Sequence, residues 1–167
     1  MCFNFEAKRH IAFLVFSLSV SVNAQSLVGI DSNYFKVRIL KLNLLSPVAQ
    51  ALGLGYEIST SQSSSLQING LFAGGGFLIT SEYRYYLSET PAPKGTFIAP
   101  FGNYGKVDTQ DIYGGGIVIG YQGFFKKKIT VDAFFGPSYQ VGLFDRSGFF
   151  VRGGLFLGVN LRKPPNK

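Results

Sequence analysis

The stretch that decides the fold is ITVDAFFGPS, residues 129–138, in which apolar side chains alternate with polar or small ones. Successive side chains of a β-strand point to opposite faces, so this stretch predicts a strand with one apolar face. The apolar face holds Ile129, Val131, Ala133 and Phe135, and the other face holds Thr130, Asp132, Gly136 and Ser138. Helical spacing of apolar residues is rare in this chain, which favours an all-β protein.

The same alternation recurs from residue 37 onward, interrupted by clusters of Pro, Gly, Ser and Asp that are typical of turns. It predicts eight strands over residues 37–45, 52–60, 65–72, 78–87, 96–105, 113–124, 129–141 and 149–161. The fifth strand has no distinct polar face, and residues 106–111 and 144–148 are predicted as connections. Pro100 and Pro137 each remove a hydrogen-bond donor, which indicates a bulge or a strand end.

Residues 1–24 have the features of a secretory signal peptide. Lys8, Arg9 and His10 precede an apolar run, and a site of small residues ends at Ala24. A transmembrane helix would need about 20 apolar residues, and the run over residues 11–22 is shorter. We expect cleavage between Ala24 and Gln25 and a single barrel domain over residues 25–167.

Cleavage would leave 143 residues with a formal charge of +6 and with neither Cys nor His. Catalytic triads, thiol chemistry and the commonest zinc sites all need one of these residues. We therefore expect no enzymatic activity and no cofactor or metal. An enzyme built on this chain would have to use carboxylates such as Glu57, Glu82 or Asp132.

The number of strands fits a membrane barrel. A tilted strand crosses a bilayer with about 9–11 residues, so eight strands use about 80 of the 143 residues. Ten strands would leave connections shorter than about five residues. Bacterial barrels have even numbers of strands from eight upward. The sequence therefore predicts an eight-stranded antiparallel up-and-down transmembrane β-barrel.

The polar face of the predicted strands carries few charges. Three are positive and three are negative: Lys41, Arg84, Arg152, Glu57, Glu82 and Asp132. A narrow lumen tolerates charges only when they are paired, so we predict a charge network inside the barrel. The alternative is a secreted or periplasmic lipocalin-like barrel, which would place these charges in water and bind a hydrophobic ligand or lipid inside.

Three further patterns have weaker implications. Lys126, Lys127 and Lys128 follow two Phe residues; a solvated turn is the default interpretation, and contact with lipid headgroups is the alternative. The Gly runs at residues 74–76 and 114–116 neither open a helix nor precede Lys-Ser or Lys-Thr, so they predict turns or curved strand ends and not nucleotide binding. No basic helical stripe is found, so we expect no nucleic-acid partner.

Several short motifs stand in order along the chain. They are residues 42–47 (LNLLSP), 55–57 (GYE), 82–87 (EYRYYL), 97–101 (FIAPF), 120–122 (GYQ) and 132–137 (DAFFGP). Together they resemble a domain-of-unknown-function family of small outer-membrane barrels from the Bacteroidota, broadly similar to OmpA-like and OmpX-like proteins. The final strand resembles the signal that the outer-membrane assembly machinery recognises, although residues 162–167 replace the usual terminal Phe.

Residues and resemblance together lead to one functional expectation. We expect a small non-enzymatic protein of the Gram-negative outer membrane, with a closed lumen and a structural or surface-interaction role. Its partners would be outer-membrane lipid and, during biogenesis, the assembly machinery, and the protein would be a monomer.

Overall fold

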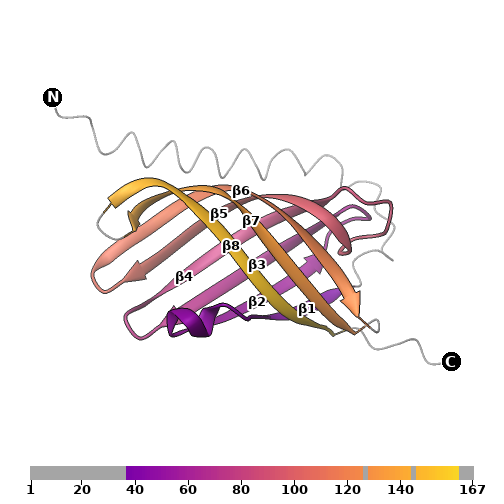
Figure 1. The fold of residues 1–167 in the computed structure, drawn as a ribbon, viewed down its shortest axis with the longest axis horizontal. Helices are drawn as coiled ribbons and strands as arrows, with labels where there is room; N and C mark the ends of the chain where they lie inside the picture. The colour runs from indigo at the N-terminus through magenta and orange to yellow at the C-terminus, as the bar shows by residue number, and fades with distance from the viewer. Residues whose placement is uncertain (1–36, 126–127, 144–145, 162–167) are drawn as a thin grey trace. The chain divides into compact units, whose positions relative to one another are not determined.

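The computed structural model describes residues 37–125, 128–143 and 146–161. Eight strands form one closed antiparallel barrel in which each strand lies beside the next in the chain and β8 lies beside β1 (Figure 1). The strands are β1 (Arg38–Asn43), β2 (Ala51–Ser59), β3 (Ser64–Ala73), β4 (Gly76–Tyr86), β5 (Gly95–Val107), β6 (Gln110–Phe125), β7 (Ile129–Leu143) and β8 (Arg146–Asn160), with the 3₁₀ helix η1 (Ser46–Ala49) between β1 and β2. The predicted eight-stranded antiparallel up-and-down fold is confirmed.

The strands are strongly staggered around the barrel. Starting at Lys41 on β1 and following the paired residues from β2 to β8, one arrives at Gly148. The direct β1–β8 ladder, however, pairs Lys41 with Gly158. The register therefore shifts by ten residues in one circuit of the barrel. Such a stagger requires the strands to tilt by roughly 35–45° from the barrel axis. Side chains fill the interior of an eight-stranded barrel, so they decide what the lumen can hold.

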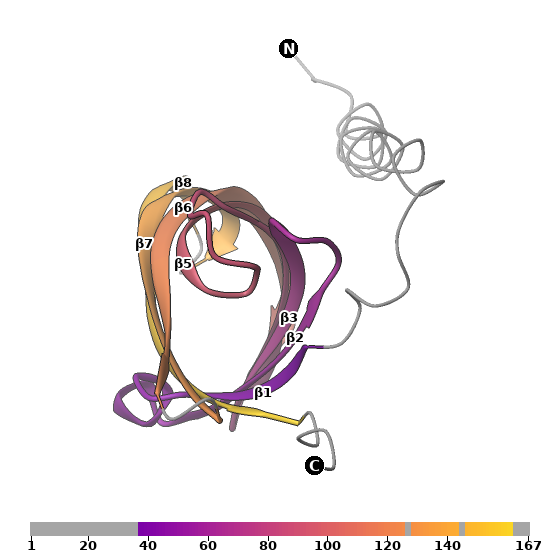
Figure 2. The same ribbon diagram turned by 90° about the vertical axis from the view of Figure 1, so that its right-hand side faces the viewer.

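The two ends of the barrel differ. At the base, where β1 begins and β8 ends, the connection over residues 87–94 folds across the opening (Figure 2). Ala92 of this connection is buried, and its N–H donates to the Gln62 carbonyl at 2.6 Å. The opposite end lacks such a cover in the part of the chain that the structure describes, and there β1 stops after six residues while β6 has 16.

Because β1 is short, the wall is complete only over part of the barrel's height. We call the level at which all eight strands pair the closed band. We call the remainder the open end: residues 51–53, 70–79, 102–116, 137–143 and 146–154. At the open end β8 pairs with β7, and its other edge has no neighbouring strand among the described residues.

Side chains alternate between the two faces as the sequence predicts, with the apolar face outward. Large apolar residues of mid-strand positions are exposed, whereas Lys41, Glu57 and Arg84 on the inner face are fully or almost fully buried. The fifth strand was ambiguous because Phe97, Ala99 and Phe101 line the interior while Ile98 and Pro100 face outward, so both of its faces are apolar.

Several predicted boundaries are wrong. Residues 106–111 are not a loop: β5 and β6 pair up to Val107 and Gln110, leaving a two-residue turn. Its first residue, Asp108, has a positive φ of 53°. In addition, β8 begins at Arg146, inside the predicted connection over 144–148, and β1 ends at Asn43, before η1, which was not predicted.

The two strand prolines interrupt one ladder each. Pairing between β4 and β5 is absent beside Pro100, and pairing between β6 and β7 is absent beside Pro137, while both prolines stay paired with their other neighbour. Of the two Gly runs, Gly74 and Gly75 form the β3–β4 turn, as predicted. The run over residues 114–116 lies inside β6, away from its ends.

Other predictions concern residues for which no structure is described. The signal peptide, the cleavage site between Ala24 and Gln25, and the side chains of Lys126 and Lys127 lie outside the described residues. Lys128 is described, and it is exposed in the β6–β7 turn. Within the described part of the chain, no helix is long and apolar enough to cross a membrane.

Candidate functional site

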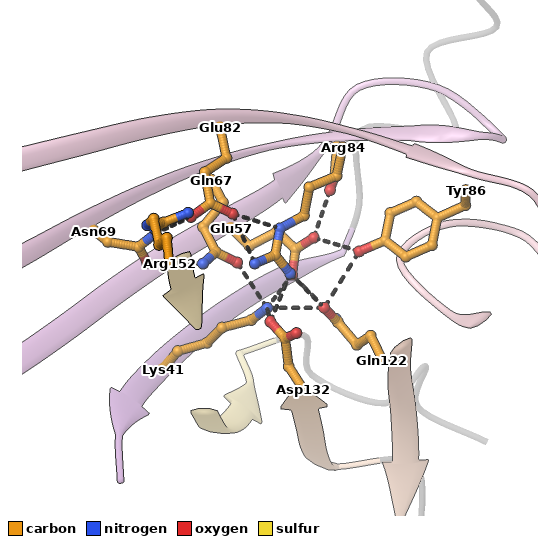
Figure 3. A network of polar contacts seen from close by, with 11 residues as sticks. Lys41, Glu57, Gln67, Asn69, Glu82, Arg84, Tyr86, Gln122, Asp132 and Arg152 are labelled. Carbon is orange, nitrogen blue, oxygen red and sulfur yellow. Dashed lines mark hydrogen bonds and ion pairs between the residues drawn. The ribbon is translucent and has the colours of Figure 1, made fainter. Parts of the chain in front are cut away.

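All six charged residues that the sequence placed on the polar face lie on the inner face and meet in one network (Figure 3). They come from five strands: Lys41 from β1, Glu57 from β2, Glu82 and Arg84 from β4, Asp132 from β7 and Arg152 from β8. Five of them are almost fully buried, and the Arg152 side chain is 18% exposed. Strand alternation brings them inward, and the stagger between strands brings residues distant in sequence to a similar height.

Lys41 lies at one centre of the network. Its Nζ is 2.7 Å from Glu57 Oε2 and 2.7 Å from Asp132 Oδ2. The same ammonium donates to the side-chain carbonyl oxygens of Gln67 at 2.7 Å and Gln122 at 2.8 Å. A buried ammonium is tolerated only when such acceptors surround it.

Arg84 lies at the second centre. Its Nη2 is 2.9 Å from Glu82 Oε2, and its Nη1 is 2.6 Å from Asp132 Oδ2. Asp132 therefore joins the two centres, since one of its oxygens accepts from both Lys41 and Arg84. Arg152 extends the network, with its Nη2 2.5 Å from Glu82 Oε1.

Neutral polar side chains complete the coordination of the two glutamates. Glu57 accepts hydrogen bonds from the Ser65 hydroxyl, from the Tyr86 hydroxyl at 2.7 Å and from the Gln122 amide at 3.0 Å. Glu82 accepts from the Asn69 amide at 2.9 Å. These bonds replace the water that each carboxylate loses on burial.

Aromatic rings flank the two guanidinium groups. Arg84 Cζ lies 4.3 Å from the centroid of the Phe97 ring, and Arg152 Cζ lies 4.3 Å from Phe101 and 4.7 Å from Phe134. Cation–π contacts of this kind are worth more when they are desolvated. Phe134 also stacks on Phe156, so the rings fill the lumen beside the charges.

The network is electrically balanced. Three cations face three anions, and each carboxylate bonds at least one cation. No group of three or more His, Cys, Asp or Glu residues that could hold a metal ion is found among the described residues. The network ties five strands together across the lumen, while two of its buried atoms, Asp132 Oδ1 and Arg152 Nη1, have no hydrogen-bond partner among the described residues.

Reasoning from the sequence missed the neutral members of this network. Gln67, Asn69, Tyr86 and Gln122 all lie on inner faces, and alternation with their apolar neighbours would have placed them there. The signal was present, but neutral polar side chains also suit a solvated face. Only the register between strands shows that they contact the charges.

Together, the sequential closed barrel and the paired charges in its interior define a class: small up-and-down barrels with an apolar exterior and a polar core. Within that class, the chain belongs to DUF3575, a family of proteins of unknown function, whose sequence profile matches residues 10–147. Comparison with curated proteins and with solved structures gives no match.

Proposed function

We propose that this protein is a non-enzymatic barrel of the Gram-negative outer membrane, with a closed lumen and a structural or surface-interaction role. The observation that carries the proposal is the inversion of polarity: apolar side chains cover the outside, and charges lie paired inside. The expected partners are outer-membrane lipid and, during biogenesis, the machinery that inserts barrels. Entry into that membrane would follow removal of residues 1–24.

The outward face has the composition that lipid contact requires. Leu54, Ile68, Ile98, Ile119 and Val131 each expose between 40% and 47% of their surface on five different strands. In water, such a continuous apolar belt would promote association. In a bilayer it is the expected lining of a barrel, and in the closed band the ladder satisfies the backbone groups that lipid cannot.

The remaining charged residues of the described strands lie outside this apolar belt. Those of the described strands that do not join the network lie at or next to a strand end: Arg38, Lys106, Asp111 and Arg146. A bilayer strongly disfavours charge at its midplane and tolerates it near the interfaces. This distribution supports a membrane-spanning orientation with the strand ends at the two surfaces.

The interior supports a role without transport. The network joins β1, β2, β4, β7 and β8 across the lumen, and aromatic rings occupy the space beside it. An ion passing through would have to displace several charge-assisted hydrogen bonds at once. The lipocalin-like alternative requires an apolar ligand cavity, and six charged side chains occupy the corresponding volume here.

Fractionation together with gel mobility tests the location. We expect the full chain, expressed in a Gram-negative host, to fractionate with outer membranes and to migrate faster on a denaturing gel when unboiled than when boiled. A soluble periplasmic protein without the mobility shift would refute the proposal. In planar bilayers the purified barrel should give no steady conductance steps, and regular large steps would refute the closed lumen.

A further inference from the structure

Six aromatic side chains form a band around the outside of the barrel at its open end. Each strand from β3 to β8 contributes one of them: Phe72, Phe77, Tyr104, Tyr113, Tyr139 and Phe149. Five expose between 42% and 84% of their surface, and the sixth, Phe77, is partly exposed. All six occupy positions that alternate with inner-face residues, so their rings point away from the lumen. We call them the aromatic band.

The register between strands holds this band at one level. In each of the hairpins β3–β4, β5–β6 and β7–β8, the two aromatic residues are direct partners in the ladder. Between hairpins the rings are offset: Tyr104 lies two positions nearer the base than Lys106, the residue paired with Phe77. Tyr139 is offset from Tyr113 in the same way. The stagger moves the register ten residues toward the open end over eight strands, so an offset of two residues per hairpin nearly cancels it.

The aromatic band separates an aliphatic surface from a charged one. On its base side lies the apolar belt, to which Ile119 belongs. On its other side, Lys106 follows Tyr104 by two positions, and Asp111 precedes Tyr113 by two. The Tyr104 hydroxyl donates to Asp111 Oδ1 at 3.0 Å, so the polar end of this ring points away from the belt. Rings with an apolar body and a polar end favour a boundary between an apolar medium and water.

We propose that the aromatic band marks the level at which the headgroups of a lipid bilayer meet the barrel. The apolar belt then lies in hydrocarbon, and the ends of the β5–β6 and β7–β8 strands, which lie at the same end of the barrel, project beyond the lipid (Figure 1). The inference rests on the proposed function and adds to it the surface that holds the barrel at a fixed depth.

The course of the band favours a lipid surface over a protein partner. It runs over six of the eight strands, and therefore around most of the circumference. A standard protein interface covers only about 10% of the surface of a small protein. A bilayer, in contrast, surrounds a barrel at one level, and transmembrane barrels carry aromatic side chains at that level. On β2 the residue paired with Phe72 is Leu52, which is 52% exposed, so the apolar surface continues there.

This level also accounts for the edge of β8 that has no neighbouring strand among the described residues. Phe149 belongs to the aromatic band, so the edge from Arg146 to Phe149 lies among the headgroups or beyond them. Headgroups and water can bond to backbone groups, and hydrocarbon cannot. Nearer the base, the Leu44 N–H donates to the Leu155 carbonyl at 2.8 Å. A short β1 is therefore compatible with insertion, because the part of the edge farthest from β1 is outside the hydrocarbon.

Single tryptophans measure the depth directly, because the sequence contains no Trp. The purified barrel is reconstituted into phosphatidylcholine vesicles whose acyl chains carry bromine either near the headgroup or near the bilayer centre. Bromine quenches the fluorescence of a Trp at its own depth. We expect Tyr104→Trp and Phe72→Trp to be quenched about twofold more strongly by the shallow bromine than by the deep one, because interfacial rings lie at headgroup level.

Two further positions bracket the aromatic band. Ile119→Trp, in the apolar belt, is the matched control and should be quenched more strongly by the deep bromine. Ser147→Trp replaces an exposed residue of β8 beyond the band, so lipid bromine should not quench it and acrylamide dissolved in the water should. Retention of the boiling-dependent gel shift shows that each variant is folded, and Tyr104 and Phe72 report on the band independently.

Three results would overturn the proposal. Stronger quenching of Tyr104→Trp and Phe72→Trp by the deep bromine would place the band within the hydrocarbon. Absence of lipid quenching at both positions, with Ile119→Trp still quenched, would place the membrane surface nearer the base. Lipid quenching of Ser147→Trp would place the β8 edge in the bilayer. If lipid bromine quenched none of the variants, Ile119→Trp included, the barrel would not be inserted at all, and the proposed function would fail together with this inference.

Discussion

The closed band and the open end of this barrel are built from the same strands but hold different interiors. In the closed band, where every strand has two neighbours, the lumen contains the charge network and the aromatic rings beside it. At the open end the inner positions carry small or neutral residues such as Gly114, Gly116, Ser138 and Gln140. Arg152 has its backbone there, yet its guanidinium reaches Glu82 in the closed band.

The difference indicates that enclosure decides where charge can be buried. A buried ion is stable only with partners on several sides, and these partners exist where the wall is complete. In the closed band, β1, β2, β4 and β7 supply five of the six charges, and β3 and β6 add neutral donors and acceptors. At the open end, where β1 is missing, inner glycines pack closely against the neighbouring backbone: an added Cβ would lie 2.3 Å from the Tyr139 carbonyl oxygen at Gly114 and 2.2 Å from the Pro137 carbonyl oxygen at Gly116.

The largest expected effect comes from breaking the network. Arg84→Met removes the cation that bridges Glu82 and Asp132, leaving both carboxylates under-compensated inside the barrel. Removal of one partner of a buried pair costs about 3–5 kcal/mol. Urea unfolding in detergent, followed by loss of the unboiled gel mobility, should show a loss of this size. Lys106→Met, exposed at the open end, is the control and should change the unfolding free energy by less than about 0.5 kcal/mol.

If Arg84→Met changed the unfolding free energy as little as the Lys106→Met control, the ion pairs would not be what stabilises the closed band. Water would then have to enter the lumen and solvate Glu82 and Asp132. Deuterium exchange of the backbone amides of β4 would distinguish this case, because a solvated lumen should speed exchange there without global unfolding.

The open end should be sensitive to backbone packing instead. A Cβ added at Gly116 would lie 2.2 Å from the Pro137 carbonyl oxygen on the neighbouring strand, so Gly116→Ala forces β6 and β7 apart. Overpacking of this kind costs about 1–3 kcal/mol. Gly148→Ala is the matched control, since an added Cβ there meets no atom within 4 Å. Equal unfolding midpoints for the two variants would contradict this view of the open end.

How much of this could be predicted depends on which physical signal each feature leaves in the sequence. The alternation of apolar and polar residues predicted the eight strands. It also placed Asp132 and Glu57 on the inner face, because they lie opposite the apolar face of their strands. Alternation says nothing about the register between strands, which is set by closure of the whole barrel. The bonds of Asp132 to Lys41 and Arg84 therefore needed the structure.

Hairpin tips were mispredicted for a related reason. Lys106, Asp108 and Asp111 suggested a solvated loop, yet polar residues also suit strands that extend beyond an apolar belt. The predicted first strand is too long because Leu44 continues the alternation. The chain turns after Asn43, whose side-chain oxygen accepts a hydrogen bond from the Leu45 N–H at 2.9 Å. Such local competition between a side chain and the ladder is not visible in a hydropathy pattern.

A smaller effect is expected from a single neutral member of the closed band. Tyr86→Phe removes the hydroxyl that donates to Glu57 at 2.7 Å and leaves the ring against Phe97. Glu57 keeps its bonds from Lys41, Ser65 and Gln122, so the loss should be about 1–2 kcal/mol. The unfolding midpoint in urea measures it. A loss as large as that of Arg84→Met would mean that the hydroxyl, and not the ion pairs, limits the stability of the network.

The smallest effect is expected from Asp108→Gly, at the tip of the open end in the β5–β6 turn. Asp108 adopts a φ of 53°, and its N–H donates to the Gly75 carbonyl at 2.7 Å, which links two neighbouring turns. Asp108→Gly keeps that N–H and suits a positive φ, so the unfolding free energy should change by less than about 0.5 kcal/mol. Asp108→Val forces a β-branched residue into the same conformation and should cost about 1–2 kcal/mol. Because this turn does not contact the network, Asp108→Val should leave the boiling-dependent gel shift unchanged. Loss of the gel shift would show that the open end folds cooperatively with the closed band.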